Sequence, residues 1–588
     1  MAHFTWRLVL TVVVSTMGSS IQFYHCGILN NPQSIVLNWM NQTYSDRGIK
    51  MSKDSLTVLM SFTVAAVNFG ATLGSLFTRW YVDHVGRRNG LIVNGVSNLV
   101  ALALASSAKV SKSPEMLIVG RIILGINLGS ASGVVPIYVT EISPVKYRGA
   151  FGTIHMIFVA FGDFLSLLIG LPQILGTETL WPVAIALPGI PALVLTLVLP
   201  FCADSPRYLL MSKKNDQAAK SACEFFLGNE NAETAMKELR HESRLAQVYH
   251  FRTDGHHNSV QRLLRTPEIR TPLLISVLVM IAQQFTAIAV FFGFSTEIFQ
   301  SVGLDIDSAR FSTTGIGAGY FLFSLSSIYL IERLGRRVLS LLQLTGCLTC
   351  LIVFFAANLV SDYRPEFSRS VGIISIVDLV AFMCIYGAGS PVPWMISSEL
   401  FTIENRSTAV SISTFVAWFL AFAIATLFLP FQTAVGRSFA FLPFIVILAA
   451  SVAAIALLLP ETKQKTIEQI VAEFRRRKTT FSRRVTETFA NTFSTATRQD
   501  ETESLLSGWS AKNSHGKYPN SIPGSGANGS YRNYGGLGGT EIGGDHLTVP
   551  EYEKGGKRVR PTRKAVRVAE DRSDESDTST VLEEGEEK

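Results

Sequence analysis

Residues 83–88, Asp-His-Val-Gly-Arg-Arg, and residues 332–337, Glu-Arg-Leu-Gly-Arg-Arg, are two copies of one short charged motif. Each copy directly follows an apolar stretch that is long enough to cross a bilayer as a helix, for which about 20 residues are needed. A polar motif that recurs at matching places indicates the duplication of one structural unit. The two copies therefore predict a chain built from two similar helical halves.

Apolar stretches of membrane-spanning length recur along most of the chain on both sides of these motifs. Six precede the polar segment 206–268 and six follow it. The pattern predicts an all-α membrane protein with about 12 transmembrane helices in two six-helix bundles. The expected spans are 7–28, 57–79, 90–108, 115–139, 150–171, 180–202, 271–294, 311–331, 338–360, 370–395, 407–430 and 438–459.

The composition favours a membrane protein and argues against a nucleic-acid-binding one. Of the 588 residues, 48% are hydrophobic and only 16% are charged, whereas a soluble protein carries roughly 25% charged residues. The net charge of +7 comes from short Lys and Arg clusters between apolar stretches. Because no single basic face results, membrane lipid rather than nucleic acid is the expected partner.

The Lys and Arg clusters also predict the orientation in the membrane. They are concentrated in the loops that share a side with both Gly-Arg-Arg motifs, so the positive-inside rule places both termini in the cytosol. The segment 29–56 would then face the outside. It contains the sequon Asn41-Gln42-Thr43, which makes Asn41 a candidate glycosylation site.

Changes in composition divide the chain into four segments. Residues 1–205 and 269–465 are the two expected bundles, and residues 206–268 form a polar linker suited to short cytoplasmic helices. Residues 466–588 become Arg-rich, then rich in Gly, Ser and Asn, and finally acidic. Such a tail is expected to be cytoplasmic and mostly disordered, and its sequence indicates no particular protein partner.

A second pair of motifs repeats between the halves. Glu141 and Arg148 are seven residues apart after the fourth span, and Glu399 and Arg406 have the same spacing after the tenth. Arginine offers forked donors to carboxylates, so these groups could pair across the cytoplasmic side and open when the bundles move. The predicted cytoplasmic gate consists of Arg87, Arg88, Glu141, Arg148, Glu332, Arg336, Arg337, Glu399 and Arg406.

The ordered motifs resemble those of the facilitative glucose transporters, in the sugar-porter group of the major facilitator superfamily. The resemblance runs from about residue 24 to residue 470 and leaves only the tail unmatched. It implies the major facilitator fold and a location in the plasma membrane. The motifs that carry it include Gly86-Arg-Arg, Pro136-Ile-Tyr-Val-Thr-Glu141, Asp204-Ser-Pro-Arg207, Gln283-Gln284, Gly335-Arg-Arg, Pro391-Val-Pro-Trp394 and Pro460-Glu-Thr-Lys463.

The resemblance implies a hexose bound near the middle of the membrane. Gln283 and Gln284 are suited to this task, since each amide offers two donors and an acceptor to sugar hydroxyls. Trp394 and Trp418 match family tryptophans that line the cavity and could stack on a CH face of the sugar. Helix packing is the alternative role of the two tryptophans.

Several family positions that bear polar side chains are apolar or aromatic in this chain. The family's sugar-contacting Gln is replaced by Met156, its Asn residues by Ala289, Tyr320 and Ala417, its Glu by Tyr386, and its paired tyrosines by Gly293 and Phe294. Losing three contacts at about 1 kcal/mol each would weaken binding about 100-fold. We therefore expect a cavity that is more apolar and aromatic than a glucose site.

Three titratable residues in apolar surroundings are candidates for proton coupling. Asp163 and Asp378 lie within predicted spans, and His25 lies at the end of the first span, where Arg121 could approach it. Inserting a charged acid at the middle of the bilayer costs roughly 2.5–3.5 kcal/mol, so these acids are expected to have a functional or structural role. The alternative is structural, with the acids lying near helix ends or accepting hydrogen bonds from hydroxyls such as Ser166 and Ser375.

The favoured function is facilitative uniport of a hexose or a related small polar solute by alternating access. Two alternatives remain open, namely a proton-coupled carrier and a sugar-transporter-like sensor that does not transport. No nucleotide-binding P-loop appears, so we do not expect ATP-driven pumping. No nucleophile–base pair or metal-ligand cluster stands out in the soluble parts, so we do not expect an enzyme. We also expect neither a cofactor nor a metal site.

Overall fold

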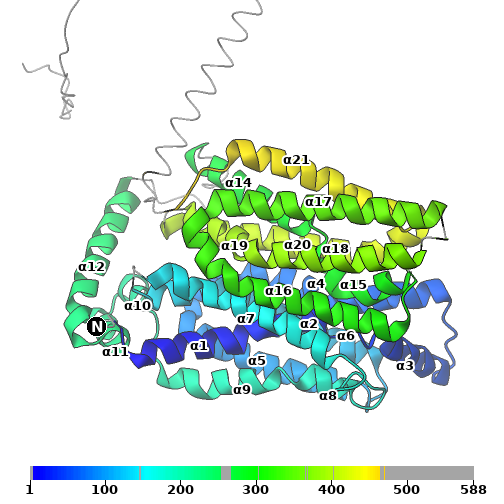
Figure 1. Cartoon of the computed structure of the whole chain (residues 1–588). Helices are drawn as coiled ribbons and strands as arrows, with labels where there is room; N and C mark the ends of the chain where they lie inside the picture. Colours follow the sequence, from blue (N-terminus) through cyan, green and yellow to red (C-terminus); the bar gives the residue numbers. More distant parts are fainter. Residues whose placement is uncertain are drawn as a thin grey trace, which may run out of the picture. The chain divides into compact units, whose positions relative to one another are not determined.

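The computed structural model describes residues 4–144, 147–252, 267–301, 303–364, 366, 368–401, 403–463 and 469. The side chain of Arg148, residues 253–266 of the predicted linker and nearly all of the predicted tail 466–588 lie outside this description. The described part is helical, and its long helices run side by side with alternating direction (Figure 1).

The first half contains six membrane crossings. The first is a broken helix, because α1 (Trp6–Ser20) continues through the 3-10 turn Ile21–Phe23 into α2 (Tyr24–Gly27). A short helix, α3 (Gln33–Asp46), follows it. The other crossings are α4 (Lys53–Val85), α5 (Arg87–Ser107), α6 (Pro114–Ile142), α7 (Arg148–Ile169), and the pair α8 (Trp181–Ala186) and α9 (Gly189–Val198).

Three polar helices then connect the halves at one end of the molecule (Figure 1). They are α10 (Pro206–Met211), α11 (Asp216–Leu227) and α12 (Asn229–Arg252). The second half comprises α14 (Pro267–Gln284) and α15 (Ile288–Ser301), α16 (Ile306–Leu334), α17 (Arg336–Tyr363), α18 (Ser368–Gly389) and α19 (Pro391–Glu399), α20 (Ile403–Val435), and α21 (Leu442–Leu458).

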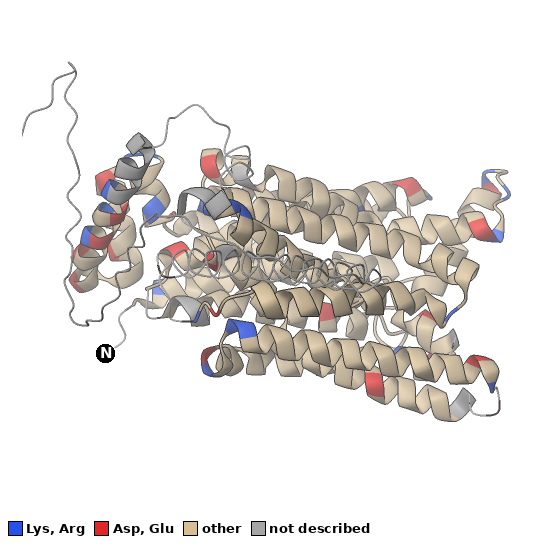
Figure 2. Cartoon of the chain, turned by 90° about the horizontal axis from the view of Figure 1, so that it is seen from above, with Lys and Arg blue, Asp and Glu red and all other residues tan. Residues whose placement is uncertain are grey.

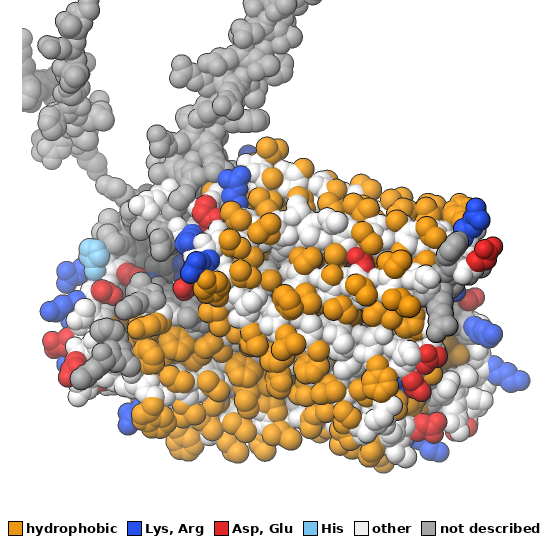
Figure 3. All heavy atoms as spheres, in the orientation of Figure 1, with side chains coloured by type: hydrophobic (Ala, Val, Ile, Leu, Met, Phe, Trp, Pro, Cys, Tyr) orange, Lys and Arg blue, Asp and Glu red, His pale blue; other side chains and the backbone are white. Residues whose placement is uncertain are grey.

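Eleven described helical segments are long and apolar enough to cross a membrane, and the broken first crossing brings the total to the predicted twelve. Charged residues gather at the two ends of the helices, with few between them (Figure 2). Apolar side chains cover the visible side between those ends (Figure 3). Exposed side chains such as Val183, Ile190 and Leu197 would face lipid there.

Within the first half, α4 and α6 pack with their backbones in contact. A Cβ added at Gly70 would lie 2.0 Å from the carbonyl oxygen of Ile122, and one added at Gly125 would lie 2.1 Å from that of Val67. Small residues allow such close approach of helices in membranes. The halves meet along α4 and α20, along α7 and α16, and at α2 and α15.

Candidate functional site

A cavity lies where the two halves meet. Its empty space is about 810 Å³, including the part open to solvent. The first half contributes Phe23, Cys26, Val64, Asn68, Met156, Val159 and Asp163. The second half contributes Gln284, Ile288, Ala289, Phe292, Tyr320, Tyr386, Ser390, Trp394, Trp418, Ala421 and Ala425.

Broken helices border the cavity on both sides. The 3-10 turn of the first crossing carries Phe23, and the gap between α14 and α15 lies between Gln284 and Ile288. The gap between α18 and α19 lies at Ser390. Irregular backbone at membrane depth is tolerated where it lines a cavity, because its polar groups find partners or solvent there.

Three of the four residues predicted to bind substrate line this cavity. Gln284, Trp394 and Trp418 do so, and the buried Oε1 of Gln284 has no partner among the described residues. Gln283 does not line it, because its Oε1 accepts a hydrogen bond of 3.0 Å from Nε2 of Gln343. Gln283 therefore lies behind the wall of the cavity, against α17.

The two tryptophans form an aromatic group that bridges the halves. Their ring centroids are 6.4 Å apart, and the ring of Phe23 lies 5.6 Å from that of Trp418. Nε1 of Trp418 donates a hydrogen bond of 3.3 Å to Oγ of Ser132 in the first half. Trp418 therefore has a packing role as well as a place in the cavity wall.

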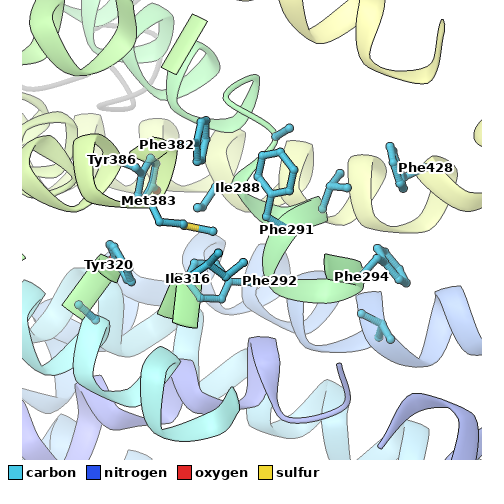
Figure 4. Packing of buried hydrophobic residues seen from close by; sticks show 14 of the residues in the cluster. Ile288, Phe291, Phe292, Phe294, Ile316, Tyr320, Phe382, Met383, Tyr386 and Phe428 are labelled. Atoms are coloured by element: carbon cyan, nitrogen blue, oxygen red, sulfur yellow. The ribbon is translucent and has the colours of Figure 1, made fainter. Parts of the chain in front are cut away.

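The departures from the family pattern make the cavity largely apolar and aromatic. Met156, Ala289, Tyr320 and Tyr386 all line it. The ring of Tyr320 lies 5.5 Å from that of Phe292 and 5.6 Å from that of Tyr386. Figure 4 shows the three rings near Met383. Gly293, Phe294 and Ala417 are not among the lining residues.

Of the three residues considered for proton coupling, Asp163 alone lines the cavity. His25 is buried, and neither ring nitrogen has a partner among the described residues. Arg121 approaches it as expected but donates to its main-chain carbonyl, at 3.1 Å, and not to its ring. Asp378 lies on α18, where its side chain shares a hydrogen bond with the thiol of Cys350.

The structural alternative for the two acids needs a correction. The hydroxyl of Ser166 donates to the main-chain carbonyl of Asp163, at 2.6 Å, and not to its carboxyl group. Oγ of Ser375 is buried without a partner among the described residues. A hydroxyl on a helix readily bonds the carbonyl three or four residues earlier, which removes it as a donor to a neighbouring carboxylate.

Both Gly-Arg-Arg turns lie at one end of the helices, called here the arginine end, and the contacts there repeat between the halves. Nη2 of Arg87 donates to Oε1 of Glu141 at 3.0 Å, and Nη2 of Arg336 donates to Oε1 of Glu399 at 3.0 Å. Ser205 donates a short hydrogen bond to Glu141, and Thr462 donates to Glu399 at 2.8 Å.

The second arginine of each turn also has matching contacts. Nη1 of Arg88 donates to the carbonyl of Cys202 at 2.8 Å, and Nη2 of Arg337 donates to that of Ala456 at 2.7 Å. All these pairs join helices of the same half. Of the other predicted gate residues, Glu332 is exposed and Arg406 is half-buried. Pairing between the two halves at this end stays a prediction.

At the opposite end, side chains join the two halves directly. Nδ2 of Asn30 donates to Oγ of Ser295 at 2.8 Å, and Oδ1 of Asn30 accepts from the N–H of Thr296 at 3.1 Å. The hydroxyl of Thr296 donates to Oδ1 of Asn31 at 2.9 Å. Asn41, on the exposed side of α3, also lies near this end. Asn30 and Asn31, which follow α2, therefore join the first half to α15 at this end.

A family model described as "Sugar (and other) transporter" matches residues 10–474. The chain belongs to this sugar transporter family. Among its curated relatives, the facilitated glucose transporter member 3 of solute carrier family 2 from Rattus norvegicus is 34% identical over 475 residues, which cover 80% of this chain and 94% of that protein. Member 1 from Gallus gallus is 33% identical over 473 residues, covering 80% and 94%.

Comparison with solved structures identifies the fold of this member of the sugar transporter family. The major facilitator proton:xylose symporter XylE, bound to 6-bromo-6-deoxy-D-glucose, superposes with a TM-score of 0.65 at 21% identity. The match covers 79% of this chain and 99% of that one. The chain therefore has the major facilitator fold and is a multi-pass membrane protein, as the sequence predicts.

Two carboxylates of this sugar transporter, Asp204 and Glu461, have a structural role that the sequence analysis does not predict. Oδ1 of Asp204 accepts the N–H of Arg88 at 3.1 Å, and Glu461 accepts the N–H groups of Arg336 and Arg337 at 2.9 and 3.1 Å. Each carboxylate caps the helix that follows a Gly-Arg-Arg turn. Asp204 follows the sixth span and Glu461 follows the twelfth. This matching position in the two halves is the sequence signal that could have predicted their shared role.

Proposed function

We propose that the chain is a facilitative carrier that moves a hexose or a related small polar solute across the plasma membrane by alternating access. The observation that supports this most strongly is the cavity at the junction of two repeated halves, lined by side chains from both. Rocking of the halves would expose that cavity to one side of the membrane and then to the other. The facilitated glucose transporters among its relatives support the same function.

Three lining residues are assigned to the solute. Gln284 offers donors and an acceptor to hydroxyl groups, while Trp394 and Trp418 offer apolar ring faces. The arginine and glutamate clusters at the arginine end serve as the cytoplasmic gate in this proposal. Both termini lie in the cytosol, and Asn41 carries a glycan on the outer side.

Solute uptake into proteoliposomes tests this function. The purified full chain is reconstituted, and uptake of a panel of radiolabelled hexoses, pentoses and polyols is measured with and without an imposed pH gradient. We expect saturable uptake of at least one solute that does not depend on the gradient. Uptake only with a proton gradient would favour the coupled carrier, and no uptake of any solute by a correctly folded protein would favour the sensor.

A further inference from the structure

Asp163 is the one carboxyl group among the described residues that line the cavity. It lies on α7, its side chain is 5% exposed, and its Oδ1 has no hydrogen-bond partner in the described part of the chain. No Lys, Arg or His belongs to the described lining. A buried acid without a partner is costly in its charged form, so this carboxyl group either holds a proton or needs a cation beside it.

The buried cation Arg121 does not pair with Asp163. Arg121 is fully buried in α6, and its guanidinium donates to the main-chain carbonyls of Thr63 and Val64 at 2.8 and 3.1 Å, as well as to that of His25. Among the described residues, Asp163 forms no ion pair. The described scaffold therefore supplies no cation for the Asp163 carboxyl group.

Aromatic rings enclose the same space. Phe23, Phe292, Tyr320, Tyr386, Trp394 and Trp418 all line the cavity. Tyr320 and Tyr386 line the same cavity as Asp163. The negative faces of aromatic rings attract organic cations, and rings around one carboxylate are typical of sites that recognise ammonium groups.

We propose that the solute of this cavity carries a protonated amino group, for which Asp163 is the counter-ion. The inference rests on the proposed carrier function and narrows its substrate class to small amine-bearing polar solutes, such as an amino sugar. The ammonium group lies against Asp163 and the tyrosine rings. The hydroxyl groups of the solute bind Gln284, a neutral polar lining residue that the second half contributes.

The test compares an amino sugar with its neutral parent. Binding and uptake of D-glucosamine and D-glucose are measured with the purified full chain at pH 6, where an amine of this kind is protonated. Binding is followed by quenching of intrinsic tryptophan fluorescence and uptake in proteoliposomes. We expect D-glucosamine to bind at least about 10-fold more tightly than D-glucose, since a hydrogen bond to a charged group contributes about 1.5–3 kcal/mol.

Three variants locate the effect. Asp163→Asn keeps the size of the side chain and is expected to reduce the preference for D-glucosamine over D-glucose about 10-fold to 100-fold. Asp163→Glu should restore part of the preference. Asp378→Asn removes an intramembrane acid outside the cavity and should leave the preference unchanged. Thermal unfolding verifies that all three fold.

The outcomes separate this inference from the proposed function. If D-glucose binds and is taken up as well as D-glucosamine, and Asp163→Asn affects both equally, the carrier stands and the counter-ion assignment is wrong. If a proton gradient drives D-glucose uptake and Asp163→Asn abolishes this, Asp163 carries a proton instead. If D-glucosamine binds through Asp163 but is not taken up, the inference stands and the carrier function fails.

Discussion

Gln283 and Gln284 are adjacent in the sequence but have different surroundings. Gln284 lines the cavity, whereas Gln283 is hydrogen-bonded to Gln343 on α17. Successive side chains of a helix point about 100° apart, so two neighbours rarely face the same cavity. The sequence predicts that this pair of amides is unusual in an apolar span, but the choice between them depends on the rotation of α14, which only packing decides.

Replacing each amide should therefore have a different effect. Gln284→Leu is expected to weaken solute binding about 10-fold while changing the melting temperature little, because it removes a group that contacts the solute. Gln283→Leu should instead lower the free energy of unfolding by about 1–3 kcal/mol, because it leaves the amide of Gln343 buried without its partner. Solute titration and thermal unfolding in detergent measure the two effects. Equal loss of affinity in both variants would contradict the assignment.

At the scale of elements, the sequence predicts the crossings better than their interruptions. The expected span 7–28 is present, but it is broken at Ile21–Phe23, where no Gly or Pro gives a signal. The expected span 271–294 is likewise broken between α14 and α15, whereas Pro391 does mark the break before α19. Hydropathy reports the length of an apolar stretch, and the breaks follow from the cavity that these helices border.

The Gly-Arg-Arg turns are the elements that the sequence predicts most sharply, and their glycines are required by geometry. Gly86 and Gly335 have φ of +96° and +84°, which L side chains rarely adopt. A Cβ added at Gly335 would also lie 2.7 Å from the Glu461 carboxylate that caps α17. Each turn therefore joins two spans with a sharp reversal and holds the following arginines in place.

Substitutions at two glycines, Gly335 at the end of α16 and Gly315 inside it, test this role of the turn. Gly335→Ala is expected to lower the free energy of unfolding by about 1–3 kcal/mol, because it imposes a strained backbone and displaces Glu461. Gly315→Ala is the matched control, since Gly315 lies inside α16 with open space around its Cβ position. Alanine favours a helix there by up to about 1 kcal/mol. Thermal unfolding that ranks the two variants the other way would refute the role of the turn.

At the scale of the whole molecule, the repeated motifs predict two halves with both Gly-Arg-Arg turns at one end, and the structure agrees. The sequence could not predict which helices join the halves, because contacts between α7 and α16 or between α2 and α15 depend on packing and leave no periodic signal. The contacts of Asn30 and Asn31 with α15 were missed for the same reason. They keep the halves together at the end opposite the arginines.

Transport by alternating access requires those contacts to separate in every cycle, and a cross-link tests this directly. In a background without the native cysteines, Asn30→Cys and Ser295→Cys place a thiol on each half where the side chains now lie 2.8 Å apart. The control pair, Ser276→Cys and Ser413→Cys, replaces two hydroxyls 2.8 Å apart on α14 and α20, within one half. Uptake is measured before oxidation, after oxidation and after reduction.

The account predicts that oxidation abolishes uptake by the pair that joins the halves and that reduction restores it, while the control pair keeps its activity throughout. Undiminished uptake with the halves almost completely cross-linked at Asn30 and Ser295 would contradict the movement of one half against the other around the central cavity.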